Sequence, residues 1–433
     1  MSANILSRSS ILRTTVAPDC EILHDVQDPR FHERLRRWTK IDRKIPTAII
    51  LPRSEEDCLK TVQWALQSSI PFVPTCGGHS AWSTIGEEGI IIDLSHYADV
   101  HVDADYKTAT LVGGVLSKQV GVRLAEADLF TALGNDNTVG AIPYFLGGGA
   151  SKTSSITGLG SDQILSARVI VAKDGGKLLE VTEKEHPDLL WALRGAGQFF
   201  SLITQLTIRA HTFSLLRKQQ GLIWTGAFIF PLERFQEVVA VMQKLMVDAQ
   251  HATAAMMMIV MPPPTRTPSL VIAVRYTGDE DPEVPFKPLN DLHPPGGNRQ
   301  RCCYSKRQRR TRSTVRQNDF KQFGVIIETW KKLMRDCPDA INTGFNFQWD
   351  SRPVKTPEVE SATSLHDIHY WHNNLVWHTE ERNRRKVDAY NEKCISIMRG
   401  GDTSRFVDFP NSTRVGPIER RYRGEARLEK LRK

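Results

Sequence analysis

Glycine-rich loops placed behind short apolar strands constrain the fold of this chain more than any other feature. The first loop runs from Cys76 to Ser80 with the sequence Cys-Gly-Gly-His-Ser, and it follows an apolar run that ends at Pro74. Glycine permits backbone conformations in which neighbouring N–H groups converge on an anion. A plain turn that holds a hydrogen-bonded histidine would carry the same residues, so this loop alone leaves both interpretations open.

A strand, a helix and a second strand are predicted to precede this loop. Thr47 to Leu51 is a short β-branched and apolar run, and Ser54 is followed by three acidic residues, the pattern of a capped helix start. Apolar residues then recur at helical spacing up to Leu66. Two further buried strands are predicted at Gly89–Leu94 and Thr108–Gly114.

A second stretch rich in glycine and serine extends from Thr138 to about Leu165. Such a composition is unusual for a plain connection and indicates backbone that lies close to a ligand. Predicted elements after it are a hairpin of Ser166–Ala172 with Lys177–Val181, a helix at Pro187–Leu193 and a strand at Leu202–Ile208. We therefore predict an α+β domain over residues 41–212.

Residues 213–415 are predicted to form a second domain, an antiparallel sheet covered by helices. This domain is expected to lie over the first domain. Its predicted strands are Gly221–Phe230, Ala254–Met261 and Ser269–Tyr276, with a helix at Leu232–Met246. Residues 1–40 are expected to form an N-terminal extension. Residues 416–433 are expected to return to the first domain.

Positive charge is concentrated in a basic block from Asn298 to Gln317. The block holds eight of the 57 Lys and Arg residues and no acidic residue, so the remainder of the chain has 49 basic and 49 acidic residues and no general affinity for polyanions. The block lacks apolar periodicity, and we expect an exposed, unstructured loop. Three interpretations remain open: a solvated loop, a localisation or polyanion-binding patch, or sequence foreign to the native protein through a misassigned reading frame or intron boundary.

The length of 433 residues with 40% hydrophobic residues allows two domains with substantial cores. Seven cysteines form neither a disulfide-like ladder nor a Cys-x-x-Cys pair, which indicates a reducing compartment. No stretch approaches the roughly 18 apolar residues that a membrane span needs, and the N-terminus lacks the pattern of a secretion signal. We expect a cytoplasmic protein without a membrane partner.

Six internal motifs and one terminal motif occur in an order and spacing shared with a known family. They are Gly77–Ser80, Ile91–Ser95, Thr138–Gly140, Leu146–Gly149, Asp162–Ala167, Asp188–Gly195 and Arg427-Leu428. With them the chain resembles the FAD-linked oxidoreductases of the berberine-bridge-enzyme-like family, whose cofactor domain has the PCMH-type or vanillyl-alcohol-oxidase-type FAD-binding fold. The match is strong over residues 44–212 and weaker beyond them.

The resemblance implies that FAD binds with its diphosphate on the first glycine loop, its ring against residues 134–155 and its adenosine end near Asp162 and the backbone around Ile170. His79 is implied to bond covalently to the 8α methyl group of the flavin, which raises the reduction potential of the ring. A noncovalent histidine beside the ring is the alternative. The cofactor-binding residues implied are Cys76, Gly77, Gly78, His79, Ser80, Thr138, Val139, Gly140, Gly147, Gly148, Gly149, Ser151, Ser154, Gly158, Asp162 and Ile170.

The chain departs from the family pattern at three places. Asp136 stands where many members have a cysteine that forms a second bond to the flavin, so at most one covalent link is expected. Phe199 and Ser201 replace the asparagine and glycine of a usual Gln-Asn-Phe-Gly run. The C-terminal element around Arg427 differs from the family pattern, and the usual tail that follows it is expected to be altered and cut short.

The activity implied is removal of a hydride from a small organic substrate, in secondary metabolism, with dioxygen as the electron acceptor. The alternative is a catalytically degenerate relative that binds flavin in an incomplete site. Tyr276, Tyr370 and His369 are suitable in type for a catalytic base, but nothing in the sequence selects one, so the catalytic residues stay unassigned.

Other patterns are interpreted as structural. Four histidines between His366 and His378 match no compact zinc spacing, so we expect no metal. Gly195-Ala196-Gly197 follows a predicted helix and lacks a third glycine, which argues against a nicotinamide-binding loop. Met256-Met257-Met258 is expected to fill a core or line a pocket.

Overall fold

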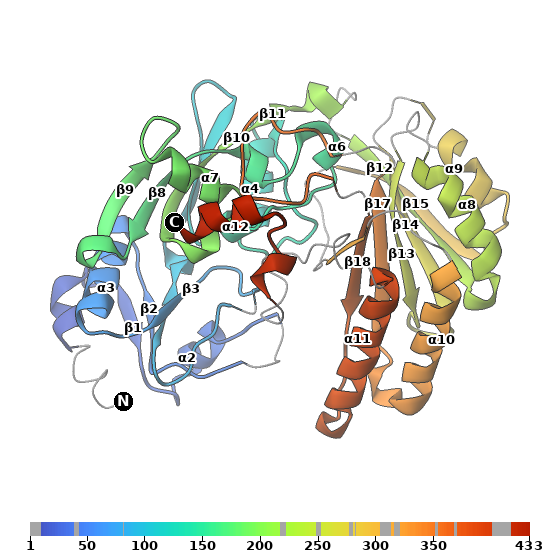
Figure 1. Ribbon diagram of the computed structural model, residues 1–433, viewed down its shortest axis with the longest axis horizontal. Coiled ribbons are helices and arrows are strands. Elements are labelled where there is room, and N and C mark those ends of the chain that lie inside the picture. Colours follow the sequence, from blue (N-terminus) through green and yellow to red (C-terminus); the bar gives the residue numbers. More distant parts are fainter. Residues whose placement is uncertain are drawn as a thin grey trace.

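The computed structural model describes residues 10–38, 43–80, 82–216, 222–247, 253–276, 280–281, 283–303, 313–315, 321–350, 354–367, 370–400 and 417–433. The chain forms two lobes that lie side by side (Figure 1), the first built mainly from the N-terminal half and the second from the C-terminal half. No helix in the described part of the chain combines the length and the apolar character that a membrane crossing requires.

The first domain contains a four-stranded sheet in the order β1-β2-β4-β3. These strands are β1 (Glu21–Leu23), β2 (Ala48–Leu51), β3 (Phe72–Thr75) and β4 (Ile90–Asp93). β2 and β3 both run parallel to β4, with helix α3 (Glu55–Gln67) between them in the chain. The hydroxyl of Ser54 accepts a 3.1 Å hydrogen bond from the N–H of Asp57, which confirms the predicted cap.

A five-stranded antiparallel sheet completes this domain, in the order β5-β6-β10-β8-β9. Its strands are β5 (Ala98–Val102), β6 (Thr108–Gly113), β8 (Ile164–Val171), β9 (Lys177–Val181) and β10 (Leu202–Arg209). The helices α4 (Ser117–Ala125), α5 (Ala141–Leu146) and α7 (Pro187–Ala196) share one buried apolar cluster with these strands. The predicted hairpin and helix of this region are confirmed.

Residues 10–38 are an integral part of the first domain, so the expectation of a separate N-terminal extension is wrong for them. β1 pairs with β2 at the edge of the sheet. Leu12 and Cys20 are fully buried in the cluster that also contains the apolar face of α3, and Phe31 of α2 (Pro29–Arg34) is buried in the neighbouring cluster. The missed signal was the short β1, whose pairing partner lies about 28 residues further along the chain.

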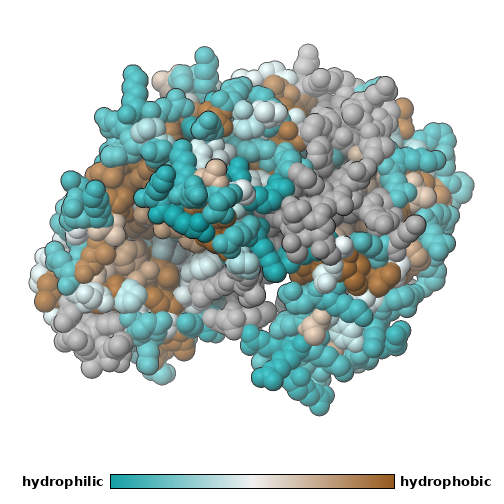
Figure 2. Space-filling model, in the orientation of Figure 1, coloured by the Kyte–Doolittle hydropathy of each residue, from teal (hydrophilic) through white to brown (hydrophobic). Residues whose placement is uncertain are grey.

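The end of the chain returns to the first domain. Helix α12 (Glu425–Arg432) lies beside α7 (Figure 1) and shows a hydrophilic outer surface (Figure 2). Tyr422 is fully buried just before it, and its hydroxyl donates a 3.0 Å hydrogen bond to the carbonyl of Gly195. The Lys430 ammonium stands 4.4 Å from the ring centroid of Trp191 on α7.

The second domain is a seven-stranded antiparallel sheet in the order β15-β12-β14-β13-β17-β18-β16. These are β12 (Leu222–Pro231), β13 (Thr253–Val260), β14 (Ser269–Tyr276), β15 (Gly296–Cys303), β16 (Ser313–Val315), β17 (Gly344–Asp350) and β18 (Tyr370–Leu375). Four helices cover one face of this sheet (Figure 1): α8 (Phe235–Val247), α9 (Glu283–Asn290), α10 (Lys321–Asp336) and α11 (Arg384–Arg399).

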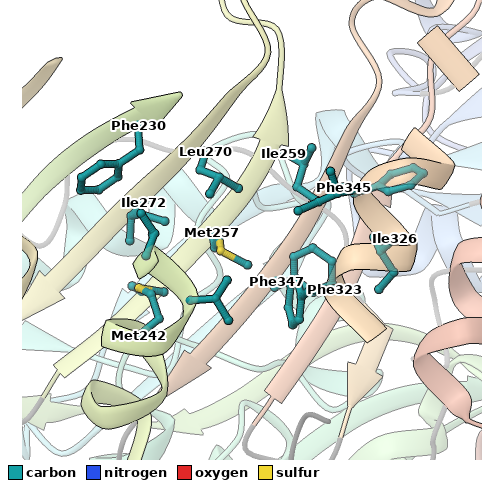
Figure 3. Packing of buried hydrophobic residues seen from close by; sticks show 14 of the residues in the cluster. Phe230, Met242, Met257, Ile259, Leu270, Ile272, Phe323, Ile326, Phe345 and Phe347 are labelled. Carbon is teal, nitrogen blue, oxygen red and sulfur yellow. The ribbon is translucent and has the colours of Figure 1, made fainter. Parts of the chain in front are cut away.

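The alternation of side chains along each strand separates the two faces of this sheet. Met257 on β13 and Phe347 on β17 point toward Met242 of α8 and Phe323 of α10 (Figure 3), and all four are buried in one cluster. Met256 and Met258 therefore belong to the opposite face, away from α8 and α10. The outer surface of α10 and α11 is hydrophilic (Figure 2), as expected for amphipathic helices.

Part of the basic block is ordered, so the expectation of an unstructured loop is wrong for residues 298–303 and 313–315. β15 pairs with β12 over the register Leu222↔Cys303 to Ile229↔Gly296, and β16 pairs with β18. Edge strands make backbone hydrogen bonds with any sequence, and charged residues on them hinder edge-to-edge association. The other residues of the block lie outside the described residues.

The buried His372 on β18 makes the stability of the protein depend on pH. Burial lowers its pKa to about 4, and its ring stacks on Phe347 at 4.8 Å. An unfolded histidine has a pKa of about 6.5, so below that pH the unfolded chain binds more protons and the free energy of unfolding falls as the pH falls toward 4. Between pH 7 and pH 4.5 we expect the native protein to lose about 2 kcal/mol more than His372→Asn, measured by urea denaturation. Equal losses in the two proteins would contradict this assignment.

Candidate functional site

The two predicted glycine loops are in direct backbone contact. A Cβ atom on Gly77 would lie 2.1 Å from the carbonyl oxygen of Thr138 and 2.5 Å from the nitrogen of Gly140. A Cβ atom on Gly140 would lie 2.6 Å from the sulfur of Cys76. Because backbone atoms surround Gly77 here, only glycine fits at this position.

His79 projects from the first loop and contacts the second loop. Its Nε2 atom is 2.8 Å from the Oγ1 atom of Thr138. Its ring stacks against Trp38 with 6.2 Å between centroids, and the N–H of Trp38 donates a 3.1 Å hydrogen bond to the carbonyl of Gly78. Trp38 therefore contacts the first glycine loop through both its ring and its backbone, and no local sequence pattern predicts this contact.

Asp136 lies on the buried side of Thr138, the partner of His79, and only 4% of Asp136 is exposed. Its Oδ1 atom accepts hydrogen bonds from the N–H of Thr138 at 2.9 Å and from the hydroxyl of Thr138 at 2.8 Å. The single hydroxyl hydrogen of Thr138 points to the carboxylate, so this oxygen accepts from His79 and the network assigns a hydrogen to Nε2. The Oδ2 atom of Asp136 is buried and has no hydrogen-bond partner among the described residues.

The rest of the second glycine stretch folds back on itself. Gly148, Gly149 and Gly158 adopt φ values of +102°, +67° and +85°, which favour glycine. The N–H of Gly160 donates to the carbonyl of Gly149 at 2.7 Å. Asp162 accepts a 2.8 Å hydrogen bond from the N–H of Leu159 and pairs with His366 at 2.9 Å, so its carboxylate already has two partners.

Several other predicted cofactor contacts are engaged within the protein. Gly147 ends helix α5, and Ile170 is buried in the core at β8. The hydroxyl of Ser154 accepts a 2.8 Å hydrogen bond from the N–H of Ser151. Ligand contacts of Gly147, Ile170, Ser151 and Ser154, together with Ser80 and Val139, stay predictions.

Cys76 is a packing residue between the two loops. Its thiol lies 3.5 Å from the carbonyl of Val115. Burial raises the pKa of this thiol to about 12, so it stays protonated at neutral pH. A protonated thiol is a poor nucleophile, which makes Cys76 unsuitable for a covalent bond to a ligand.

The face of the second sheet that points away from α8 and α10 meets the second glycine stretch. Ser155 donates a 3.1 Å hydrogen bond to Asp350 at the end of β17. Trp371 of β18 is buried in a cluster with Ala150 and Leu159 of the first domain. On the same sheet face, the Gln348 side-chain amide donates a 3.5 Å hydrogen bond to the sulfur of Met256. The second domain thus covers the site with a surface of mixed polarity.

The residues present fit a long polar ligand. Four buried polar atoms on or beside the glycine loops have no hydrogen-bond partner among the described residues: Thr75 Oγ1, Asn135 Oδ1, Asp136 Oδ2 and Ser161 Oγ. Buried polar groups of native proteins are normally paired, so such a group of atoms indicates a missing partner. The side chain of Arg37 lies 3.3 Å from the Cβ position of Gly78, and its Nη2 atom is buried and unpaired within the described chain. A cation at this loop complements an anion such as a diphosphate.

Of the candidate bases, Tyr276 is the one whose side chain the structure describes, and it does not lie at the glycine loops. Tyr276 is buried on the helix-covered face, where its hydroxyl accepts a hydrogen bond from the N–H of Glu280. His372 is buried with its ring stacked on Phe347 of that core, and His369 and the side chain of Tyr370 are outside the described residues. Within the described ranges, no group of three or more His, Cys, Asp or Glu residues is placed to hold a metal ion. Phe199 packs edge-on against Trp82 at 5.8 Å, at the position where the family pattern has asparagine.

Comparisons with known proteins identify relatives of this arrangement. Residues 46–182 match the family model described as FAD binding domain. FAD-linked oxidoreductase hasG of Aspergillus fumigatus is 32% identical over 271 residues, which cover 61% of this chain and 55% of hasG. The chain thus spans about half the length of the curated relatives it matches.

Two solved structures have the same fold. BBE-like 1 of Physcomitrella patens superposes with a TM-score of 0.81 over 98% of this chain and 94% of its own, at 17% identity. Glucooligosaccharide oxidase of Acremonium strictum superposes with a TM-score of 0.76 over 98% of this chain and 95% of its own, at 19% identity. The FAD of that oxidase is described as 6-S-cysteinyl and 8α-N1-histidyl. These superpositions confirm the predicted PCMH-type, two-domain α+β fold.

Proposed function

We propose that this chain is an FAD-linked oxidoreductase of the berberine-bridge-enzyme-like family, which binds FAD through His79 and oxidises a small organic molecule. The observation that carries this proposal is the contact between the two glycine loops, with His79 joined to Thr138 at 2.8 Å. When bound, FAD supplies a hydride acceptor whose reduced form passes its electrons to dioxygen.

The residues of this chain supply binding and orientation in this proposal. The backbone around Gly77 and Gly78 receives the diphosphate, and the Arg37 guanidinium balances part of its charge. His79 makes the single covalent bond, because Asp136 cannot form a thioether and the Cys76 thiol is buried and protonated. The sheet face around Gln348 and Met256 closes the site over the substrate and excludes water.

The substrate is proposed to be a small molecule of secondary metabolism. The relatives hasG of Aspergillus fumigatus and fogF of Aspergillus ruber are both named FAD-linked oxidoreductases, which supports a redox role but names no substrate. The five cysteines whose side chains the structure describes are free of disulfides, which supports a reducing compartment such as the cytoplasm.

An absorption spectrum before and after denaturation tests this proposal. The purified protein is expected to be yellow and to keep its flavin fluorescence in the pellet after acid precipitation. Anaerobic addition of an oxidisable alcohol or amine substrate should bleach the flavin absorbance, and air should restore it with release of hydrogen peroxide. A colourless protein would favour a degenerate relative in place of an oxidase.

A further inference from the structure

The position that commonly supplies a second covalent link in the family holds an acid in this chain, and the structure gives this acid specific contacts. Asp136 is almost fully buried and lies two residues before Thr138 on the second glycine loop. One carboxylate oxygen accepts both hydrogen bonds that Thr138 can donate, from its N–H and from its hydroxyl. A buried carboxylate costs free energy unless its charge is used or balanced.

The hydroxyl of Thr138 connects this carboxylate to His79. Because the hydroxyl hydrogen of Thr138 points to Asp136, the Thr138 oxygen accepts a hydrogen bond from Nε2 of His79, at a distance of 2.8 Å. In a neutral imidazole with a hydrogen on Nε2, the lone pair is on Nδ1. The partner of one ring nitrogen thus decides which nitrogen can act as nucleophile. The Trp38 ring, stacked on the imidazole, restricts its rotation.

We propose that Asp136, through the hydroxyl of Thr138, fixes the tautomer of His79 and removes its Nε2 proton while Nδ1 bonds to the flavin. This inference rests on the proposed covalent role of His79. Asp136 is a positioning residue in this scheme, since it acts on the flavin only through Thr138 and His79. Two consecutive hydrogen bonds of 2.8 Å connect the three residues, one between His79 Nε2 and Thr138 Oγ1 and one between Thr138 Oγ1 and Asp136 Oδ1.

Covalent attachment of the flavin is a two-electron oxidation, with dioxygen as the oxidant. A bond forms between Nδ1 and the 8α carbon, while one C–H bond of that methyl group and the Nε2–H bond of the imidazole break. The two electrons of the broken C–H bond reduce the ring, and dioxygen takes them up with the two released protons to give hydrogen peroxide. The Nε2 proton passes to the Thr138 oxygen as the Thr138 hydroxyl proton passes to Asp136.

Replacement of Asp136 by Asn tests this role, because Asn keeps a similar shape and can still accept the hydrogen bond of Thr138. Full-length protein from riboflavin-limited cells is incubated with FAD, and two quantities are followed: total bound flavin by absorbance, and covalent flavin by fluorescence after acid precipitation and by the mass of the intact chain. In D136N we expect total bound flavin close to the native value, with covalent attachment slower by on the order of 100-fold.

Thr138 and a remote aspartate provide matched variants. T138V should slow attachment as D136N does, and T138S should restore it. Asp105 is an exposed aspartate whose Oδ1 atom accepts a 2.8 Å hydrogen bond from the N–H of Lys107 and a second one from the hydroxyl of Thr108. It therefore has hydrogen bonds like those of Asp136, but away from the glycine loops. D105N should attach flavin at the native rate.

The outcomes separate this inference from the proposed function. Native attachment rates in D136N, or a loss of total flavin that equals the loss of covalent flavin, would overturn the role of Asp136 and leave the function of His79 intact. If the native protein binds FAD without any covalent bond, both the His79 link and the role of Asp136 are wrong. If covalent flavin forms in native protein and disappears only in the His79 variant, the inference alone fails.

Discussion

Replacing His79 by Ala should move all flavin from the pellet to the supernatant when the purified protein is precipitated with acid. His79 supplies the only nucleophile that the described part of the site offers to the flavin, because burial raises the pKa of the neighbouring Cys76 thiol to about 12. Asp136 is a carboxylate and cannot form the thioether that a cysteine would form there. The expected change in covalent flavin is therefore from nearly all to none, measured by fluorescence of the denatured chain.

Noncovalent binding should survive this substitution, because the backbone of the glycine loops is unchanged. The variant should still be yellow before denaturation, with a lower reduction potential of its flavin than the native protein. His101→Ala is the matched control, since His101 lies on β5 with a side chain that is 59% exposed and away from both loops. Fluorescence that stays with denatured H79A protein would locate the bond at another residue.

Local chemistry explains why most elements of the first domain could be predicted. The cap at Ser54, the buried runs of β2 and β4, and the hairpin between β8 and β9 depend on residues within a few positions of one another. The contact of the two glycine loops also has a local cause, since Gly77 and Gly140 are the positions where a side chain would collide with backbone or with Cys76.

The missed features depend on contacts between distant parts of the chain. Trp38 contacts His79 across about forty residues, and no pattern around Trp38 indicates that contact. β15 was mistaken for a loop because an edge strand is held by backbone hydrogen bonds to β12 and needs no apolar alternation. For Asp136 the sequence showed which bond is impossible, but the hydrogen bonds to Thr138 became visible only in the folded chain.

Replacing Gly77 by Ala should abolish flavin binding and destabilise the protein. The added Cβ atom would lie 2.1 Å from the Thr138 oxygen and 2.5 Å from the Gly140 nitrogen, and neither backbone atom can rotate away. The loops must separate by about 1 Å or more, which also breaks the contact between His79 and Thr138. We expect a loss of about 3 kcal/mol in the free energy of unfolding, measured by urea denaturation, and protein that is colourless as purified.

Gly121→Ala is the control that separates this effect from a general effect of glycine substitution. Gly121 lies within helix α4, and the nearest atom to its Cβ position is a Leu133 methyl carbon at 3.7 Å, an ordinary contact distance. Alanine is a better helix former than glycine, so this variant should gain about 0.5 to 1 kcal/mol and keep its flavin. If G77A kept native flavin content, the two loops would have room for a side chain, and a cofactor held by close approach of their backbones would be excluded.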